Sequence, residues 1–364
     1  MKRLASLDAL RGFDMFWIMR GDSLLCAIMA LFGVKGFRAA FGHVPWEGVH
    51  FMDTVFPLFL FMAGVSFPFS AAKSQEKGLS RRSVAFKALR RGLTLFALGI
   101  LYGGFTEKLN FADFRIPSVL GYIGFGWMVA AWIYLGVRNV KLRLGIAFGI
   151  LAAVTLFFGF VPAPDAPAGA SVFSPEGHFG CWLDRTVLGR HSYSKMFDPE
   201  GFGGLFCTVV TAMLGMFAGD LVRRGGTEPT GRKALQLLGA GGISLAGGLL
   251  LSLFYPIVKA LWSPSFVLVM GGYSFAMFAL FYWMVDVKGW KRGFFFFQVI
   301  GMNSITIYVG QRLVKFGYTS DFLLTGLANT LPPVWGSVLI KVGYIAVCWL
   351  FLYFLYRKNV FLKI

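Results

Sequence analysis

The sequence predicts an all-α, polytopic integral membrane protein with about ten transmembrane helices and with both termini on the cytoplasmic side. Hydrophobic residues make up 57% of the 364 residues, and charged residues make up only 14%. Because soluble domains carry about 25% charged residues, this chain cannot cover a water-facing surface. The formal net charge of +18 is gathered between the apolar runs. That pattern follows the positive-inside rule and does not indicate a nucleic-acid-binding surface.

The first half of the chain contains five apolar runs, each compared with the roughly 20 residues that cross a bilayer. The run 9–32 is long and contains charges, so we interpret it as a retained helix and not as a cleaved signal peptide. The run 51–72 carries no charge beyond Asp53, whereas 92–105 is short and extends backwards into a basic flank. The runs 117–136 and 144–161 contain no charged residue.

The second half contains five further candidates of suitable length. The runs 234–257 and 264–285 contain no charged residue. Each of 202–222, 293–314 and 335–356 contains one. No second domain is indicated, so we expect residues 1–364 to form a single transmembrane domain.

Lysine and arginine residues alternate between rich and poor connections along these runs. The segments that hold most of them are 1–3, 73–91, 138–143, 223–233, 286–292 and 357–364. Placing these segments in the cytoplasm predicts an even number of spans, with the N-terminus and the C-terminus inside.

The first predicted helix contains charges that should be costly in a bilayer. Arg11, Asp14, Arg20 and Asp22 all lie within it. Ionisable side chains in a membrane span are functional candidates by default. Partner neutralisation inside the bundle is the structural alternative, and it stays open for Asp14 and Arg20. For Asp22 we favour a functional role.

His43 lies in a short segment at the predicted outer mouth of the bundle, together with Trp46 and Glu47. Histidine exchanges its proton near neutral pH, so His43 could act as a general base if a carboxylate orients it. Asp22 and Asp53 are the nearest acids in the sequence. A loop histidine can equally be an interfacial hydrogen-bonding residue. The competing histidines are His50, His178 and His191.

The basic stretch 73–91 has two interpretations that can hold together. It can set topology and attract anionic lipid, or it can cradle a phosphorylated cytosolic donor. Arg90 and Arg91 at its end, with Arg11 on the first helix, are the candidate donor-binding residues. The four cysteines show no metal-ligand spacing, so no metal site is predicted.

Seven short motifs, in order along nearly the whole chain, carry a family resemblance. They are Arg3-x-x-Ser6-Leu7-Asp8-x-x-Arg11-Gly12, His43-x-x-Trp46-x-Gly48, Asp53-x-x-Phe56-Pro57, Arg115-Ile116-Pro117, Phe197-Asp198-Pro199-Glu200-Gly201, Lys259-x-Leu261-Trp262-Ser263-x-Ser265 and Gly301-Met302-Asn303. With these motifs the chain resembles the heparan-alpha-glucosaminide N-acetyltransferase family, in its compact bacterial form, within the transmembrane acyltransferases.

The resemblance implies an enzyme that uses cytosolic acetyl-CoA, without a metal, to acetylate an amino sugar or glycan on the far side of the membrane. It implies that His43 is the catalytic residue. It also implies that Asp22 stands where the family has an assisting asparagine. A carboxylate cannot donate a hydrogen bond as an amide does. Relatives suggest a homodimer, and the compact form suggests the inner membrane of a bacterium.

For the mechanism we expect His43 to be the base, oriented by Asp22 or Asp53. Arg115 and Asn303 are candidate donors to the oxyanion or the sugar. Asp198 and Glu200, at the end of the external segment 162–201, could bind sugar hydroxyls, although Asp198 could instead cap a helix. The remaining candidate acceptor residues are Trp46, Lys259, Trp262 and Ser265.

Two other functions stay open on the sequence. A sugar O-acyltransferase would use the same histidine with a hydroxyl nucleophile. A small-solute transporter would also contain charges within the membrane. Transporters tend to contain inverted repeats, and the His43 motif has no counterpart in the second half of the chain.

Overall fold

The computed structural model describes residues 4–34, 36–103, 114–224, 226 and 228–362. Over these ranges the protein is helical and contains no β-strand, only two isolated bridges. Seven helices are long and apolar enough to cross a membrane. These findings confirm the predicted all-α membrane fold. The count of about ten spans and the sidedness of the termini stay predictions.

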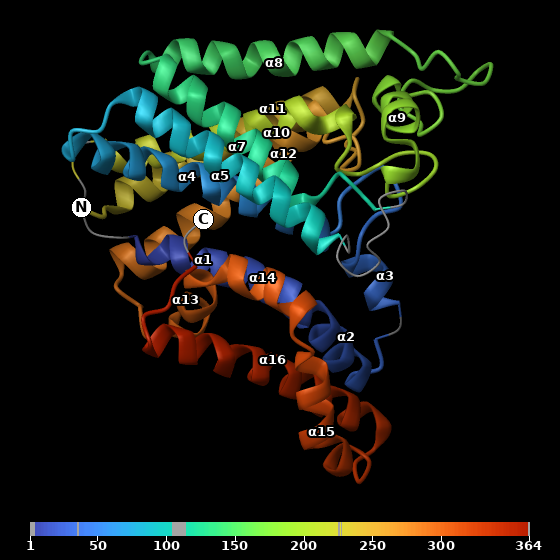
Figure 1. The fold of residues 1–364 in the computed structure, drawn as a ribbon, viewed down its shortest axis with the longest axis vertical. Coiled ribbons are helices and arrows are strands. Elements are labelled where there is room, and N and C mark those ends of the chain that lie inside the picture. Colours follow the sequence, from blue (N-terminus) through green and yellow to red (C-terminus); the bar gives the residue numbers. More distant parts are fainter. Residues whose placement is uncertain (1–3, 35, 104–113, 225, 227, 363–364) are drawn as a thin grey trace.

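The helices form two groups (Figure 1). The larger group contains α4 (Val55–Glu76), α5 (Arg81–Tyr102), α7 (Val119–Gly136), α8 (Val140–Phe160), α10 (Leu205–Arg223), α11 (Gly231–Ser252) and α12 (Pro264–Phe281). The smaller group contains α1 (Ala5–Phe16), α2 (Asp22–Leu31), α13 (Phe295–Met302), α14 (Ser304–Leu313), α15 (Phe316–Ala328) and α16 (Pro333–Arg357). Because α1 packs against α13 on one side and against α4 and α12 on the other, it joins the two groups.

Three predicted spans are absent from the seven uninterrupted apolar helices, and each has a physical reason. The run 9–32 is broken by the wide turn η1 (Trp17–Gly21) between α1 and α2. The run 293–314 is broken at Asn303 between α13 and α14. The run 92–105 is the second half of α5, whose first half is basic, and its last two residues lie outside the described residues.

Two features differ from the predicted elements. Helix α15 occupies a stretch where no helix was predicted, between the last two predicted spans. Helix α11 ends at Ser252, five residues before the predicted boundary, and leaves a turn that carries Lys259. Arg3, which opens the first motif, lies outside the described residues.

Helices α1 and α13 approach closely through two glycines. A Cβ added to Gly12 would lie 1.7 Å from the carbonyl oxygen of Phe297, and one added to Gly301 would lie 1.8 Å from that of Asp8. Small residues allow this backbone approach between helices in membranes. The contact fixes α1, and through η1 it fixes the start of the segment that leads to His43.

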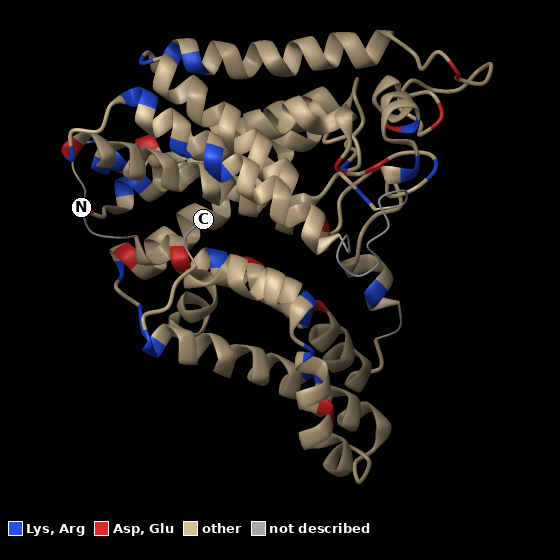
Figure 2. Cartoon of the chain, in the orientation of Figure 1, with Lys and Arg blue, Asp and Glu red and all other residues tan. Residues whose placement is uncertain are grey.

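The charged residues are unevenly distributed over the bundle. Figure 2 shows Lys and Arg gathered at the end from which α5 and α8 begin, while acidic and basic residues mix around α9 (Phe179–Leu183) at the opposite end. This is the distribution that the predicted cytoplasmic and external faces would have.

Candidate active site

His43 and Asp53 form a hydrogen-bonded dyad. His43 lies after the short helix α3 (Phe37–Phe41), and Asp53 ends the turn η2 (Phe51–Asp53) that begins α4. The Nδ1 atom of His43 lies 2.7 Å from Oδ1 of Asp53. The other carboxylate oxygen accepts the backbone N–H groups of Val44 at 3.1 Å and His50 at 3.0 Å. These bonds hold the acid, whose side chain is only 1% exposed, in one orientation.

Lys259 completes a triangle with this dyad. Its Nζ atom lies 3.0 Å from Oδ1 of Asp53 and 3.1 Å from Nδ1 of His43. The turn that carries it is tied to the histidine segment, since the Gly48 N–H donates to the Ile257 carbonyl at 2.8 Å. The sequence placed Lys259 in the acceptor site, and the structure places it against the histidine.

The donors around Asp53 determine which nitrogen of His43 carries the proton. Asp53 accepts from the lysine and from two backbone N–H groups, so it is the acceptor in this cluster. A contact of 2.7 Å between His43 Nδ1 and the carboxylate then requires a proton on Nδ1. The Nε2 atom keeps its lone pair, which is the form that a general base needs.

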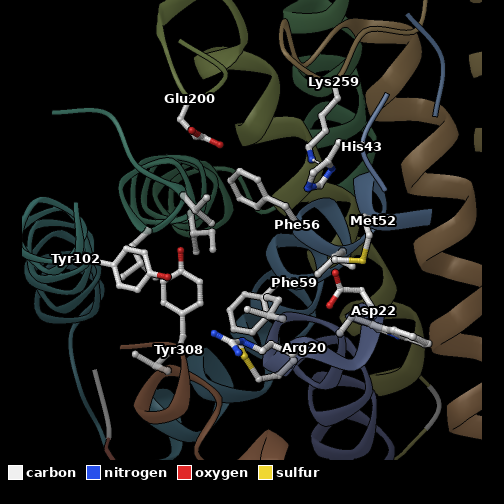
Figure 3. Close-up of a pocket in the computed structure, with 18 of the residues that line it drawn as sticks. Arg20, Asp22, His43, Met52, Phe56, Phe59, Tyr102, Glu200, Lys259 and Tyr308 are labelled. Carbon is white, nitrogen blue, oxygen red and sulfur yellow. Dashed lines mark hydrogen bonds between the residues drawn. The ribbon is translucent and has the colours of Figure 1, made fainter. Parts of the chain in front are cut away.

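Two adjoining cavities meet at His43, whose side chain is 60% exposed. The inner cavity has a volume of about 490 Å³, and its lining includes Arg20 and Asp22. The outer cavity has a volume of about 760 Å³, and its lining includes Trp46 and Arg115. Figure 3 shows the inner cavity with His43 and Lys259 at one end. Both cavities are lined by His43, Tyr102, Val119, Leu120, Glu200, Lys259 and Tyr308.

Arg115, Asp198 and Glu200, all predicted site residues, lie together at the outer cavity. The Nε and Nη2 atoms of Arg115 bind the two oxygens of Asp198 at 2.9 and 2.5 Å, and Nη2 also pairs with Glu200. Burial would lower the pKa of Arg115, but the hydrogen bonds and charges of the two acids raise it above its usual value. Asp198 also accepts the N–H groups of Tyr193 and Glu200. Its oxygens are therefore already bonded within the protein.

Asp184 positions the segment that carries Glu200. Its carboxylate accepts the backbone N–H groups of Asp198 at 3.1 Å and Phe202 at 2.8 Å. Burial raises the pKa of Asp184 to about 6, against the lowering effect of these two bonds. Burial likewise raises the pKa of Glu200, although the charge of Arg115 opposes it. Glu200 is therefore held at the wall that the two cavities share.

Three other predicted acceptor residues hold the frame of the site. The indole of Trp46 lines the outer cavity, donates to the Phe173 carbonyl at 2.8 Å and packs edge-on against Phe197. Trp262 is buried and donates to Thr211, and Ser265 donates to the Pro256 carbonyl. Neither Trp262 nor Ser265 is among the residues that line the two cavities. Both brace the turn that carries Lys259.

The remaining predicted residues are spread over the bundle. Asn303 donates to the Val360 carbonyl and so ties the C-terminal segment to the break between α13 and α14. Arg91 lies over the ring of Trp127 at 4.4 Å, within electrostatic range of Arg11. Arg90 faces a separate pocket on α5. None of these four residues is among those that line the inner or outer cavity.

Of the two acids expected to orient the histidine, the structure brings Asp53 to it. Asp22 lines the inner cavity, and no hydrogen bond to His43 is found for it. Two residues of the shared wall were not predicted from the sequence, Tyr102 and Tyr308, whose rings stack at 4.6 Å. They come from α5 and α14, and no motif links these helices. Within the described ranges, no group of three or more His, Cys, Asp and Glu side chains could hold a metal ion.

Known proteins show the same resemblance that the motifs indicate. No family model matches the chain. Over its whole length it is 27% identical to heparan-alpha-glucosaminide N-acetyltransferase from Homo sapiens and 26% identical to that from Mus musculus. The chain spans 61% of the length of each of these relatives. The similarity confirms the predicted family-level resemblance.

Proposed function

We propose that this multi-pass membrane protein is a transmembrane N-acetyltransferase that moves an acetyl group from cytosolic acetyl-CoA to an amino sugar or glycan on the opposite face. The observation that carries the proposal is the position of His43. Its imidazole is oriented by a buried carboxylate and lies in the wall where two cavities meet. Two whole-length relatives named as N-acetyltransferases support the same reaction class.

His43 takes the proton that the reaction releases. A neutral acceptor amine attacks the thioester carbonyl, so that a carbon–nitrogen bond forms and the carbon–sulfur bond breaks. The nitrogen then loses a proton to Nε2 of His43, and the imidazolium is stabilised by Asp53 through Nδ1–H. The departing thiolate takes up that proton and leaves as CoA. The base is thereby restored for the next turnover.

The developing oxyanion needs donors in the shared wall. Arg115 was expected to be one, but its Nε and Nη2 atoms are bound to Asp198 and Glu200. The hydroxyl groups of Tyr102 and Tyr308 belong to side chains that line both cavities. They are therefore the donors that we assign to the oxyanion.

The two cavities divide the substrates. The nucleotide of acetyl-CoA is charged and bulky, so it stays at the basic cytoplasmic face while its thin arm enters the inner cavity. Arg11, Arg90 and Arg91 are the candidates to hold the nucleotide there. The sugar enters the outer cavity, where Glu200 and Trp46 lie. The location that we propose is the inner membrane of a bacterium.

The test measures release of free CoA thiol by purified protein supplied with acetyl-CoA and glucosamine, with glucose as the matched sugar that lacks the amine. We expect release that depends on glucosamine and that His43→Ala abolishes while acetyl-CoA binding persists. Release with glucose at the same rate would replace N-acetylation with O-acetylation. Sugar uptake into vesicles without thiol release, unaffected by His43→Ala, would contradict the enzyme and support a transporter.

A further inference from the structure

Arg20 is a charged residue of the inner cavity that the mechanism above does not use. Arg20 is exposed into that cavity from the break between α1 and α2. Its guanidinium lies 4.5 Å from the centre of the Tyr344 ring. Among the described residues, no carboxylate comes within 4.0 Å of it. Figure 3 shows it projecting toward Tyr308 and away from the carboxylate of Asp22.

The depth of Arg20 makes this lack of a partner costly. It lies about 22 Å beyond the start of α1 if the helical rise of 1.5 Å per residue continues through the break. The hydrocarbon core of a bilayer is about 30 Å thick. Charged side chains at such depths almost always pair with a protein group or face a functional cavity. Arg20 faces a cavity, and the aromatic ring is a weak partner for a full charge.

The backbone conformation at position 20 favours glycine, which indicates that arginine is used there for its side chain. Arg20 has φ 67° and ψ 22°, in the left-handed region that favours glycine. Met19, with ψ 30°, also departs from helical geometry. A glycine at position 20 would make the same break without strain. Strained residues of this kind gather at ligand sites, and here the strain accompanies a guanidinium in a cavity that His43 also lines.

We infer that Arg20 is an anion-binding residue of the inner cavity. It takes an oxyanionic group that enters this cavity, either the phosphate at the end of the donor's pantetheine arm or a phosphate or carboxylate of the acceptor. The planar guanidinium can bind two oxygens of such a group at once, which a lysine cannot do. The inference rests on the proposed function only in assigning the anion to the donor or to the acceptor. The binding itself does not depend on turnover.

Two variants separate the positive charge of Arg20 from the planar shape of its guanidinium. Arg20→Gly removes the guanidinium and relaxes the left-handed residue, whereas Arg20→Lys keeps the charge and loses the planar fork. Lys341→Met is the matched control. It removes a cation from α16 that bonds to Ser337 and is not among the residues that line either cavity.

The experiment measures equilibrium binding to the intact protein in detergent by titration calorimetry, with probes paired by charge. 4′-Phosphopantetheine is compared with pantetheine, which is the same thiol arm without the phosphate. Glucosamine 6-phosphate is compared with glucosamine. For one pair we expect Arg20→Gly to weaken binding of the charged probe by about ten- to a hundredfold and of the neutral probe by less than about threefold. The affected pair identifies the source of the anion, and Arg20→Lys should recover part of the loss.

An equal effect of Arg20→Gly on the charged and the neutral member of both pairs, or no effect on any probe, would overturn the inference. A loss of the same size in Lys341→Met would also overturn it, because any cation in the bundle would then serve. Since binding is measured without acetyl transfer, an inactive wild type that still shows the charge-dependent loss would contradict the proposed function and leave Arg20 as an anion site.

Discussion

Replacement of Asp53 by asparagine should abolish the base without removing the histidine. The carboxylate accepts from His43, Lys259 and two backbone N–H groups. An amide has one oxygen and one N–H₂ group in place of the two oxygens. If its oxygen keeps the two backbone bonds, its N–H₂ group faces the His43 nitrogen that now donates. The imidazole must then carry its proton on Nε2, where the lone pair is needed.

The expected fall in the rate of acetyl transfer follows from this loss of the base. General base catalysis contributes about 10²- to 10⁴-fold. In the serine protease triad the equivalent aspartate-to-asparagine change lowers the rate about 10⁴-fold. We therefore expect Asp53→Asn to slow single-turnover acetyl transfer by about 10²- to 10⁴-fold. Hydrogen bonds to charged groups contribute about 1.5–3 kcal/mol each, so the variant should also lose about 2 kcal/mol or more of stability.

The assay is rapid-quench acetyl transfer from labelled acetyl-CoA to glucosamine, with the melting temperature measured on the same preparation. His43→Ala is the matched control, because the exposed ring of His43 can be removed with little loss of packing. We expect both variants to lose rate, and only Asp53→Asn to lose stability. An Asp53→Asn protein that transfers acetyl within about threefold of wild type would refute the assigned tautomer.

Three further predictions concern other parts of the molecule. Lys259→Met removes the cation beside His43 and Asp53, so His43 should be protonated more readily and the acid limb of the pH–rate profile should move upward by about one pH unit. Lys259→Arg should keep the wild-type profile. An unmoved limb in Lys259→Met would contradict the assigned contact. Burial lowers the pKa of His178 from 6.5 to about 4, so its contribution is present above pH 6.5 and is lost as the pH falls toward 4. The loss should reach about 2 kcal/mol at pH 5. In the wild type, proteolysis of the segment 162–201 should therefore become faster as the pH falls, whereas in His178→Asn its rate should not depend on pH in this range. Gly12→Ala would place a methyl group against the Phe297 carbonyl and should lower the melting temperature by several degrees, while an alanine at Gly145, whose added Cβ meets nothing, should not.

The fold class and the dyad were accessible from the sequence because they depend on local signals. Apolar runs and the basic segments between them predict helices in a bilayer. His43 and Asp53 are ten residues apart on one short connection, so their contact needs no knowledge of the tertiary fold. The helix α15 was missed because its exposed apolar residues form a run too short to predict a span.

The rest of the site depends on tertiary packing that no local pattern encodes. Lys259 reaches His43 from a turn more than two hundred residues later, through the bridge between Glu47 and Val258. Tyr102 and Tyr308 meet only because α5 and α14 border the same cavity. No proline lies at the helix break around Arg20, so the sequence does not predict that break.

We propose that His43 is the general base for acetyl transfer between two substrates held on opposite sides of the membrane. The most direct measurement uses sealed proteoliposomes of one orientation, with labelled acetyl-CoA at the face that carries 73–91 and glucosamine at the other face only. We expect labelled N-acetylglucosamine on the glucosamine side with wild type, and none with His43→Ala although acetyl-CoA still binds. Label on the sugar at an undiminished rate in His43→Ala, or acetylation only when both substrates share one compartment, would contradict it.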